Sequence, residues 1–202
     1  GFTKKMAGAE SNVSIGLSRL GHRVSWLSRI GNDEFGHFIL STLRSENVDV
    51  SRVKVDGSAP TGMMFKEKRK KGQVNVYYYR KQSAASNLSE GDIDEAWIGG
   101  AKLLHITGIT PALSESCRKA IRKAVTTARS AGIPISFDAN LRLKLWDLQT
   151  ARETLLSLVC ESTYFLPAYE EGGKLSGLNN LDKMAEFFSR RGPKAVVVKE
   201  GK

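Results

Sequence analysis

The second half of the chain alternates short apolar runs with longer amphipathic stretches, and this alternation constrains the fold more than any other feature of the sequence. The stretches repeat apolar residues every three to four positions and predict helices at residues 114–131, 148–160 and 181–190. The apolar runs predict strands at residues 103–107, 134–138, 164–166 and 195–199. Short apolar strands separated by helices are typical of a parallel sheet covered on both faces. The sequence therefore predicts an α/β fold.

The first half begins with the same pattern. Apolar periodicity predicts helices at residues 11–20 and 34–46, and apolar runs predict strands at residues 24–30 and 48–55. The segment Gly31–Gly36 lacks the spacing of a phosphate-binding loop and indicates a turn between a strand and a helix.

A β-hairpin interrupts this pattern. Two extended runs surround a turn that contains Gly72, at residues 63–69 and 74–81. Side chains alternate along a strand, so Tyr78 and Arg80 share one face of the hairpin while Tyr77 and Tyr79 share the other. A hairpin with charged and aromatic side chains, placed between βα units, indicates a lid over a binding site.

Composition excludes several classes of protein. The 202 residues are 41% hydrophobic and 26% charged, which is enough apolar side chain for a sizeable core. No apolar run could span a bilayer, no signal peptide is visible, and Cys117 and Cys160 cannot form a disulfide framework. We therefore expect a cytoplasmic protein without a membrane partner.

The formal net charge of +10 needs an anionic partner or a solvated surface. Basic residues are scattered except for one cluster at the hairpin tip: Lys66, Lys68, Arg69, Lys70 and Lys71. No stacking aromatics are interleaved with this cluster, so we interpret it as a device for solubility or strand-edge protection and expect no nucleic-acid partner. An anionic small molecule is the favoured partner.

Ligands of parallel α/β sheets bind beyond the carboxyl ends of the strands. Asp138, Asn140 and Arg142 lie at one such end, and an arginine offers paired donors to a carboxylate or phosphate. In the structural alternative, Asp138 caps the turn and pairs with Arg142. Glu170 and Glu171 follow another strand, where they would either hold Mg²⁺ through water or favour the start of the next helix.

Two further groups could contact a ligand. Residues 8–12 precede the first helix, where glycine permits close approach and Glu10 and Asn12 could bond sugar hydroxyls. Tyr78 and Arg80 could present a hydroxyl and a guanidinium to a polar anion, the alternative being cross-strand packing with a solvated charge. The chain has no nucleophile elbow, Walker A loop or dinucleotide-binding glycine pattern.

Several segments, taken in order, resemble the ribokinase (PfkB-type) family of carbohydrate kinases: residues 8–12, 17–21, 29–36, 47–50 and 60–62. Within that family, further segments resemble the 2-keto-3-deoxygluconate kinase branch: residues 77–81 with 83–86, residues 104–113, and residues 137–142 with 144–146. The resemblance covers nearly the whole chain. It implies a ribokinase-like three-layer α/β/α fold with a mostly parallel sheet and a small β lid, in which residues 1–47 and 89–202 form the core domain and residues 48–88 the lid.

The resemblance also implies an activity, namely ATP- and Mg²⁺-dependent phosphorylation of the terminal hydroxyl of a keto-deoxy sugar acid. The implied substrate contacts are Gly8, Ala9, Glu10, Asn12, Tyr78, Arg80, Ile109 through its backbone, and Arg142. The implied nucleotide contacts are Asn140, Arg142, Ala168, Lys199 and Gly201, with Glu171 indirectly associated with Mg²⁺. Family members commonly form dimers through the lid, so a homo-oligomer is expected.

The chain departs from the family pattern at several positions. Ala168 replaces the asparagine of the Mg²⁺-associated motif, Ala139 replaces a proline, and Met64 stands where some relatives have a substrate-contacting tyrosine. The catalytic Gly-Ala-Gly-Asp motif, whose aspartate is the general base, is expected beyond Lys202, and the first strand is expected before Gly1. The segment would then be incomplete at both ends and inert by itself. The alternatives are another sugar kinase of this type, such as a fructokinase, and a non-catalytic sugar-binding relative.

Overall fold

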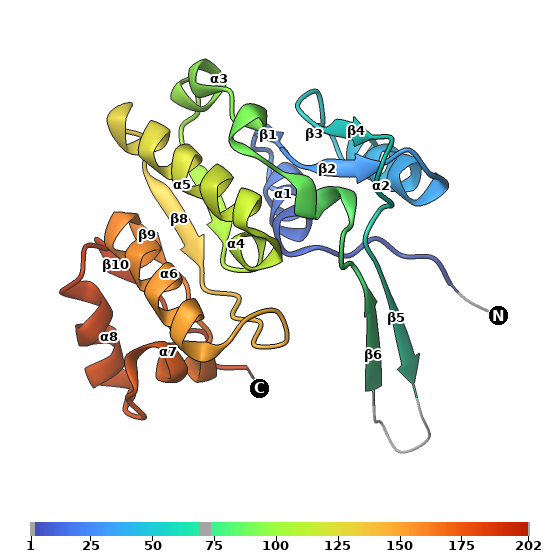
Figure 1. Ribbon diagram of the computed structural model, residues 1–202. Coiled ribbons are helices and arrows are strands. Elements are labelled where there is room, and N and C mark those ends of the chain that lie inside the picture. Colours follow the sequence, from blue (N-terminus) through green and yellow to red (C-terminus); the bar gives the residue numbers. More distant parts are fainter. Residues whose placement is uncertain (1–2, 69–73, 202) are drawn as a thin grey trace. The chain divides into compact units, whose positions relative to one another are not determined.

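The computed structural model describes residues 3–68 and 74–201, so the hairpin turn and the predicted basic residues Arg69, Lys70 and Lys71 lie outside the described residues (Figure 1). The chain forms two compact units, Gly1–Leu88 and Ser89–Lys202. We describe each unit by itself.

Unit 1 combines two helices with two parallel strand pairs and a hairpin. Its elements are α1 (Ala9–Arg19), β1 (Val24–Ser25), β2 (Arg29–Gly31), α2 (Glu34–Ser45), β3 (Val48–Asp49), β4 (Lys54–Asp56), β5 (Met63–Lys68), β6 (Val74–Tyr79) and the 3₁₀ helix η1 (Ala84–Asn87). Strand β1 pairs with β3 and β2 with β4, both in parallel. The two predicted helices are thus confirmed.

The prediction of one strand at 24–30 and another at 48–55 was wrong, because each run is divided into two short strands. Ser51 N donates to Asp49 Oδ1 at 2.8 Å, and this turn divides β3 from β4. Apolar residues continue through the break because they also face the core of unit 1, which contains Ile30, Leu40, Leu43, Val48 and Val50. Burial alone therefore could not locate the strand ends.

Strands β5 and β6 form the predicted antiparallel hairpin, which projects from the rest of unit 1 (Figure 1). Met63 pairs with Tyr79 and Met64 with Tyr78. Opposite residues share a face, so Met64 and Tyr78 lie together on one side of the hairpin. The hairpin lies inside the predicted lid segment 48–88, and the boundaries of that lid domain stay a prediction.

Unit 2 is the predicted parallel α/β arrangement. Its elements are η2 (Glu90–Asp92), α3 (Glu95–Gly99), β7 (Leu104–Thr107), α4 (Thr110–Leu113), α5 (Glu115–Ser130), β8 (Ile135–Asp138), α6 (Leu148–Glu161), β9 (Tyr164–Phe165), α7 (Tyr169–Ser176), α8 (Leu181–Ser189) and β10 (Ala195–Val196). The sheet has the order β10-β9-β8-β7, and all its neighbouring strands are parallel. The helices predicted at 114–131, 148–160 and 181–190 are α5, α6 and α8.

The core of unit 2 is built from apolar strand residues and one helix stripe. Phe137 of β8, Phe165 of β9 and Phe188 of α8 are fully buried, and the Phe165 ring packs against both others, with ring centroids 5.4 Å from Phe137 and 4.8 Å from Phe188, the latter pair edge-on. The predicted stripe of α5 is buried at Ala120, Ile121, Ala124, Val125 and Ala128. This packing holds the carboxyl ends of four strands at one edge of the sheet.

No helix among the described residues has the length and apolar character needed to cross a membrane. Cys117 is buried and Cys160 is exposed, and both are free thiols.

Candidate functional site

The predicted site residues of unit 2 gather at the carboxyl edge of its sheet. We name this group the strand-end cluster; it comprises Ile109 after β7, Asp138 at the end of β8, Asn140 and Arg142 after β8, Ala168 and Glu171 after β9, and Lys199 after β10. Because the strands are parallel and adjacent, segments far apart in the sequence end side by side.

Glu171 holds two loops of the cluster together. Its Oε1 accepts a hydrogen bond from Leu141 N at 3.0 Å, and its Oε2 accepts one from Ala168 N at 3.1 Å. Arg142 NH1 lies 3.6 Å from Oε1. Only 17% of the Glu171 side chain is exposed, so water screens these contacts weakly. Ala168, the N-cap of α7, has no side-chain acceptor for the N–H groups of the first turn, while its own backbone N–H donates to the Glu171 carboxylate.

An ion pair connects two strands that are not neighbours. Lys199 Nζ donates to Asp138 Oδ1 at 2.7 Å, and β9 lies between the strands that carry them. The backbone of Lys199 is also fixed, because its N–H donates to Pro167 O at 2.8 Å and its carbonyl accepts from Tyr169 N at 2.9 Å. The alternative pair of Asp138 with Arg142 was wrong: Asp138 pairs with Lys199, and Arg142 pairs with Glu171.

The start of the loop after β8, residues 139–141, is buried and closely packed. Gly108 N donates to Asp138 O at 2.9 Å, and a Cβ at Gly108 would lie 2.0 Å from Ala139 O, so only glycine fits there. Asn140 has a φ of 34°, in the left-handed region, and is 5% exposed. Among the described residues, no donor satisfies its Oδ1. A buried acceptor without a donor is costly and therefore marks a site where a ligand or water could bind.

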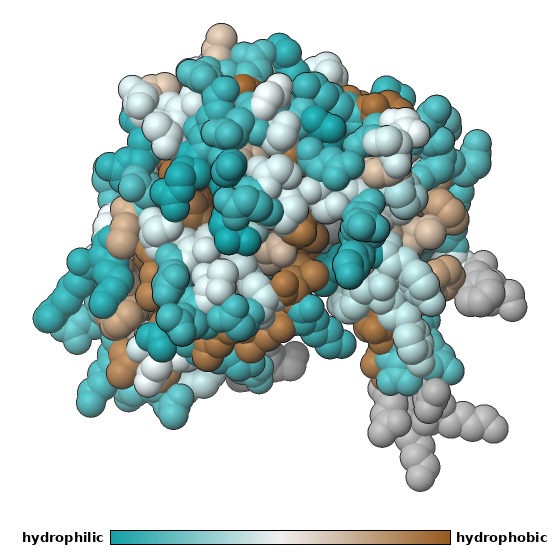
Figure 2. Space-filling model, viewed as in Figure 1, coloured by the Kyte–Doolittle hydropathy of each residue, from teal (hydrophilic) through white to brown (hydrophobic). Residues whose placement is uncertain are grey.

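The lid carries a fixed cation. The guanidinium carbon of Arg80 lies 4.2 Å from the centroid of the Tyr78 ring, which confirms that these residues share one face. Met64 pairs with Tyr78 on the same face. On the other face, Tyr79 packs edge-on against Phe65 at 5.5 Å, and Tyr77 Oη donates to Glu67 at 3.2 Å. Figure 2 shows hydrophobic residues, in brown, at the surface of this hairpin.

The remaining predicted substrate contacts surround the start of α1, also in unit 1. Gly8 is the N-cap, Ala9 is the first helical residue, and Asn12 N donates to Gly8 O at 3.0 Å. Glu10 lies in the first turn and is half-buried, whereas Asn12 is exposed. These positions are those of a helix start, as predicted, and their contact with substrate stays a prediction.

Two carboxylates that the sequence did not single out hold the base of the lid. Asp33 caps α2 through Gly36 N at 2.8 Å and also accepts from Thr61 N at 2.8 Å. Burial alone would raise the pKa of Asp33, but these hydrogen bonds outweigh burial and hold its pKa below the ordinary value. A Cβ at Gly31 would lie 2.5 Å from Asp33 Oδ2, so glycine makes this arrangement possible.

Asp56 is the second of these carboxylates. It accepts hydrogen bonds from the side chain of Asn87 and from Ser58. Those donors, Asn87 above all, hold the pKa of Asp56 far below its usual range because they stabilise the charged form. The contact of Asp56 with Ser58 has a sequence signal, because a serine two residues after an aspartate is typical of a turn closed by the aspartate side chain. The contact with Asn87 has no such signal.

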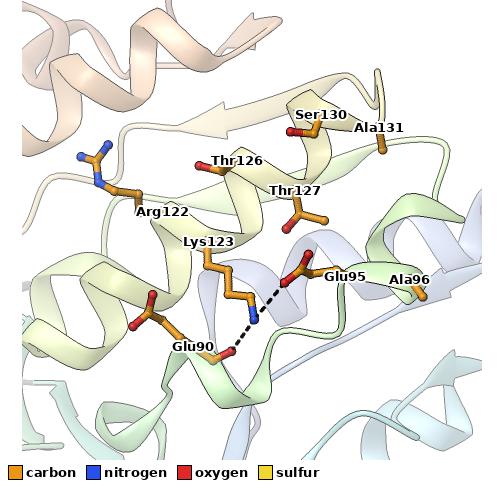
Figure 3. A pocket seen from close by; sticks show the side chains of 9 residues that line it. All are labelled: Glu90, Glu95, Ala96, Arg122, Lys123, Thr126, Thr127, Ser130 and Ala131. Carbon is orange, nitrogen blue, oxygen red and sulfur yellow. Dashed lines mark hydrogen bonds and ion pairs between the residues drawn. The ribbon is translucent and has the colours of Figure 1, made fainter.

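Unit 2 also has a hollow lined by η2, α3 and α5 (Figure 3). Lys123 crosses it, with Nζ 3.1 Å from Glu95 Oε1 and 3.4 Å from the carbonyl oxygen of Glu90. Because these charges satisfy one another, we assign no ligand to the hollow. Within residues 3–68 and 74–201, no three histidine, cysteine, aspartate or glutamate side chains are placed to hold a metal ion together.

Comparison with known proteins decides the family. The sequence profile described as pfkB family carbohydrate kinase matches residues 1–202. The chain belongs to the pfkB family of carbohydrate kinases. It is 42% identical over 203 residues to the 2-dehydro-3-deoxygluconokinase of Bacillus subtilis (strain 168), an alignment that covers 100% of the chain and 63% of that relative. Fructokinases also match, at lower identity.

Solved structures give the ribokinase-like fold of this family. The PfkB protein from Polaromonas sp. JS666 matches with a TM-score of 0.95 and 43% identity, over 99% of the chain and 68% of that structure. A putative Ribokinase II from E. coli in complex with ATP and Mg²⁺ matches with a TM-score of 0.88 and 28% identity, over 96% of the chain and 62% of that structure. The chain spans less than two thirds of the length of its curated relative from Bacillus subtilis.

The predicted site residues of this family member thus form two groups, one in each unit. Arg142, Glu171 and Lys199 meet in unit 2, with Ile109 at the N-terminus of α4 and Gly201 exposed beyond β10. Tyr78 and Arg80 meet in unit 1. Glu170 and Glu171 both lie in the first turn of α7, as the structural alternative predicts, and the indirect Mg²⁺ role of Glu171 stays a prediction.

Proposed function

We propose that the protein phosphorylates the terminal hydroxyl of a keto-deoxy sugar acid, with ATP as the phosphoryl donor. The observation that carries this proposal is the stacking of Arg80 on Tyr78, 4.2 Å from guanidinium carbon to ring centroid. The stack restricts a long, flexible side chain and fixes a positive charge on one lid face. A sugar acid has a carboxylate for that charge, whereas a neutral sugar does not. The 42% identity to a 2-dehydro-3-deoxygluconokinase supports this substrate class.

In this proposal, unit 1 binds the sugar. Gly8 and Ala9 at the start of α1 allow close approach of the ligand to the backbone, and Glu10 and Asn12 bind sugar hydroxyls. Met64 shares the face of Tyr78, so its side chain contributes to the choice between substrates.

The strand-end cluster binds the nucleotide. Arg142 is paired with Glu171, and Lys199 is paired with Asp138. When the nucleotide binds, both cations give up part of these contacts and bind phosphate oxygens. The buried Oδ1 of Asn140 accepts a hydrogen bond from the ligand or from a bound water. Ala168 and Gly201 add backbone contacts at the same edge. These groups stabilise charge as the terminal phosphoryl group of ATP passes to the sugar hydroxyl and ADP departs, and the hydroxyl proton goes to the general-base aspartate that the family resemblance implies.

The donor set fits Mg²⁺ that arrives with the nucleotide. Both oxygens of Glu171 already accept backbone N–H groups, so Glu171 is suited to contact the hydration water of the ion and not the ion directly. A bound Mg²⁺ neutralises phosphate charge. Glu171 meanwhile orients Arg142 and the loop after β8.

Exposed aromatic side chains favour assembly through the lid. Phe65, Tyr77 and Tyr79 share a hairpin face and are 42%, 47% and 61% exposed. A contiguous apolar patch of this kind is suited to a second copy of the same hairpin. The proposal therefore includes a homo-oligomer. It also keeps the expectations of a cytoplasmic location and of no nucleic-acid or membrane partner.

A substrate panel tests the proposal. The complete gene product is assayed with ATP and Mg²⁺ against 2-keto-3-deoxygluconate, fructose and ribose. We expect a kcat/KM for the sugar acid at least about tenfold above that for either neutral sugar, which corresponds to about 1.4 kcal/mol. A preference for fructose would support the fructokinase alternative, which the lower-identity relatives favour. Sugar binding without turnover would support the non-catalytic alternative.

A further inference from the structure

One carboxylate connects the chain segments that enter and leave the lid hairpin, which consists of β5 and β6. Asp56 is the last residue of β4, and its side chain is 8% exposed. Its Oδ1 accepts hydrogen bonds from Ser58 N at 2.9 Å and Ser58 Oγ at 2.6 Å. Its Oδ2 accepts one from Asn87 Nδ2 at 2.9 Å. Ser58 lies on the segment that leads into β5, and Asn87 ends η1, which follows β6.

Further contacts attach this junction to the rest of unit 1. Arg29 NH1 of β2 lies 3.6 Å from Asp56 Oδ2, with 23% of the Arg29 side chain exposed. Ala84 N donates to Pro60 O at 2.8 Å, which links the two lid segments a second time through the backbone. The lid base is therefore fixed by contacts on both segments, whereas the hairpin beyond it is held by its own strand pairing.

We propose that Asp56 is a positioning residue for the lid: through Ser58 and Asn87 it sets the direction in which β5 and β6 project from the rest of unit 1, and thereby the position of Tyr78 and Arg80. The lowered pKa of Asp56 agrees with a carboxylate that stays charged in this network. The part of the inference that concerns substrate rests on the proposed function. The part that concerns the lid direction does not.

Asp49 provides a matched control in the same unit. It accepts hydrogen bonds from Ser51 N at 2.8 Å, Ser51 Oγ at 3.2 Å and Ser25 Oγ at 2.8 Å. Asp49 thus accepts the same kinds of hydrogen bond as Asp56, but it connects β3 to β1 and not the two lid segments. Asn87→Ala and Ser25→Ala each remove one side-chain donor from a carboxylate that keeps its others, and Asp56→Asn and Asp49→Asn form the second matched pair.

The first measurement is independent of activity. Nitroxide labels at Lys66 of β5 and Ser41 of α2, both exposed, report the distance between lid and body within unit 1. The complete gene product is used, with exposed cysteines such as Cys160 replaced by serine. We expect Asn87→Ala and Asp56→Asn to widen the distance distribution about twofold or more, and Ser25→Ala and Asp49→Asn to leave it unchanged. Equal widths in the two sets would overturn the inference.

The second measurement links the lid direction to substrate. For Asn87→Ala, KM for the sugar acid should rise about three- to tenfold, while kcat and KM for ATP change less than about twofold. A merely structural role would lower the melting temperature without this selective change in KM. A wider distribution with unchanged KM overturns the substrate part alone. If the wild-type protein phosphorylates no sugar acid, the proposed function fails, and the label distances still decide the role of Asp56.

Discussion

Lys199 Nζ donates a hydrogen bond to Asp138 Oδ1 at 2.7 Å, across the strand that separates β8 from β10. This pair places an ammonium at the carboxyl edge of the sheet, where the proposal has nucleotide phosphates bind. Replacing Lys199 with alanine should therefore raise KM for ATP about tenfold, the equivalent of about 1.4 kcal/mol, with KM for the sugar acid changed less than twofold. Steady-state kinetics of the complete gene product measures both.

Lys194 is the control for this prediction. It is an exposed lysine that directly precedes β10, at the opposite end of that strand from Lys199. Lys194→Ala should leave KM for ATP unchanged. Equal effects of the two substitutions would mean that net charge, and not the position of Lys199, determines nucleotide binding.

Glu171 should matter for stability as well as for the site. Glu171→Ala would leave Leu141 N and Ala168 N without their acceptor in a poorly exposed position, which should cost about 1–3 kcal/mol of unfolding free energy. Urea unfolding measures this change. Glu170→Ala removes the neighbouring exposed carboxylate and should change stability by less than about 0.5 kcal/mol. A similar loss in both variants would contradict the bridging role of Glu171.

The geometry of Gly108 predicts a strong steric effect. In Gly108→Ala the new Cβ would meet Ala139 O at 2.0 Å and Leu155 Cδ2 at 2.9 Å, so backbone and core must both shift. We expect a loss of about 2–3 kcal/mol in unfolding free energy. Gly16→Ala in α1 has open space at its Cβ and should gain about 0.5–1 kcal/mol. Chemical denaturation distinguishes these opposite signs, and a neutral Gly108→Ala would refute the packing described here.

Acid should weaken unit 1 through Asp33. Its pKa is lower in the folded than in the unfolded state, so the charged form favours folding. That contribution is complete above the unfolded-state pKa of about 4 and is lost as the pH falls through the lower folded-state value. The urea midpoint should thus fall between pH 5 and about pH 3. Asp33→Asn should reduce this fall, whereas Glu34→Gln, at an exposed neighbour, should not.

Much of the architecture could be predicted from the sequence because periodicity reports burial. The stripe of α5 and the apolar runs of β7 and β8 gave both the elements and the parallel sheet. The short helices α3 and α4 were not predicted, because five and four residues are too few for periodicity to identify a helix. The start of α7 was predicted only as one of two roles for Glu170 and Glu171. The strand breaks after Ser25 and Asp49 were missed because apolar residues beyond them, Trp26 and Val50, still pack in the core of unit 1.

The residues of the candidate site could be named from the sequence, but the ion pairs that they form could not. Asp138, Arg142, Glu171 and Lys199 were all identified as candidates or neighbours of candidates, yet the expected pair of Asp138 with Arg142 was wrong. Asp138 and Lys199 are 61 positions apart, and only the strand order brings them together. The bond between Asp56 and Asn87 spans 31 positions and depends in the same way on tertiary structure.

The charge of Arg80 tests the central claim most directly. kcat/KM is measured for Arg80→Gln with 2-keto-3-deoxygluconate and with fructose, and Lys81→Gln, a neighbouring exposed lid cation, serves as control. The account predicts a loss of about 30- to 100-fold for the sugar acid in Arg80→Gln alone, with fructose changed less than about threefold. An equal loss for both substrates, or no loss for the sugar acid, would contradict recognition of a carboxylate by Arg80.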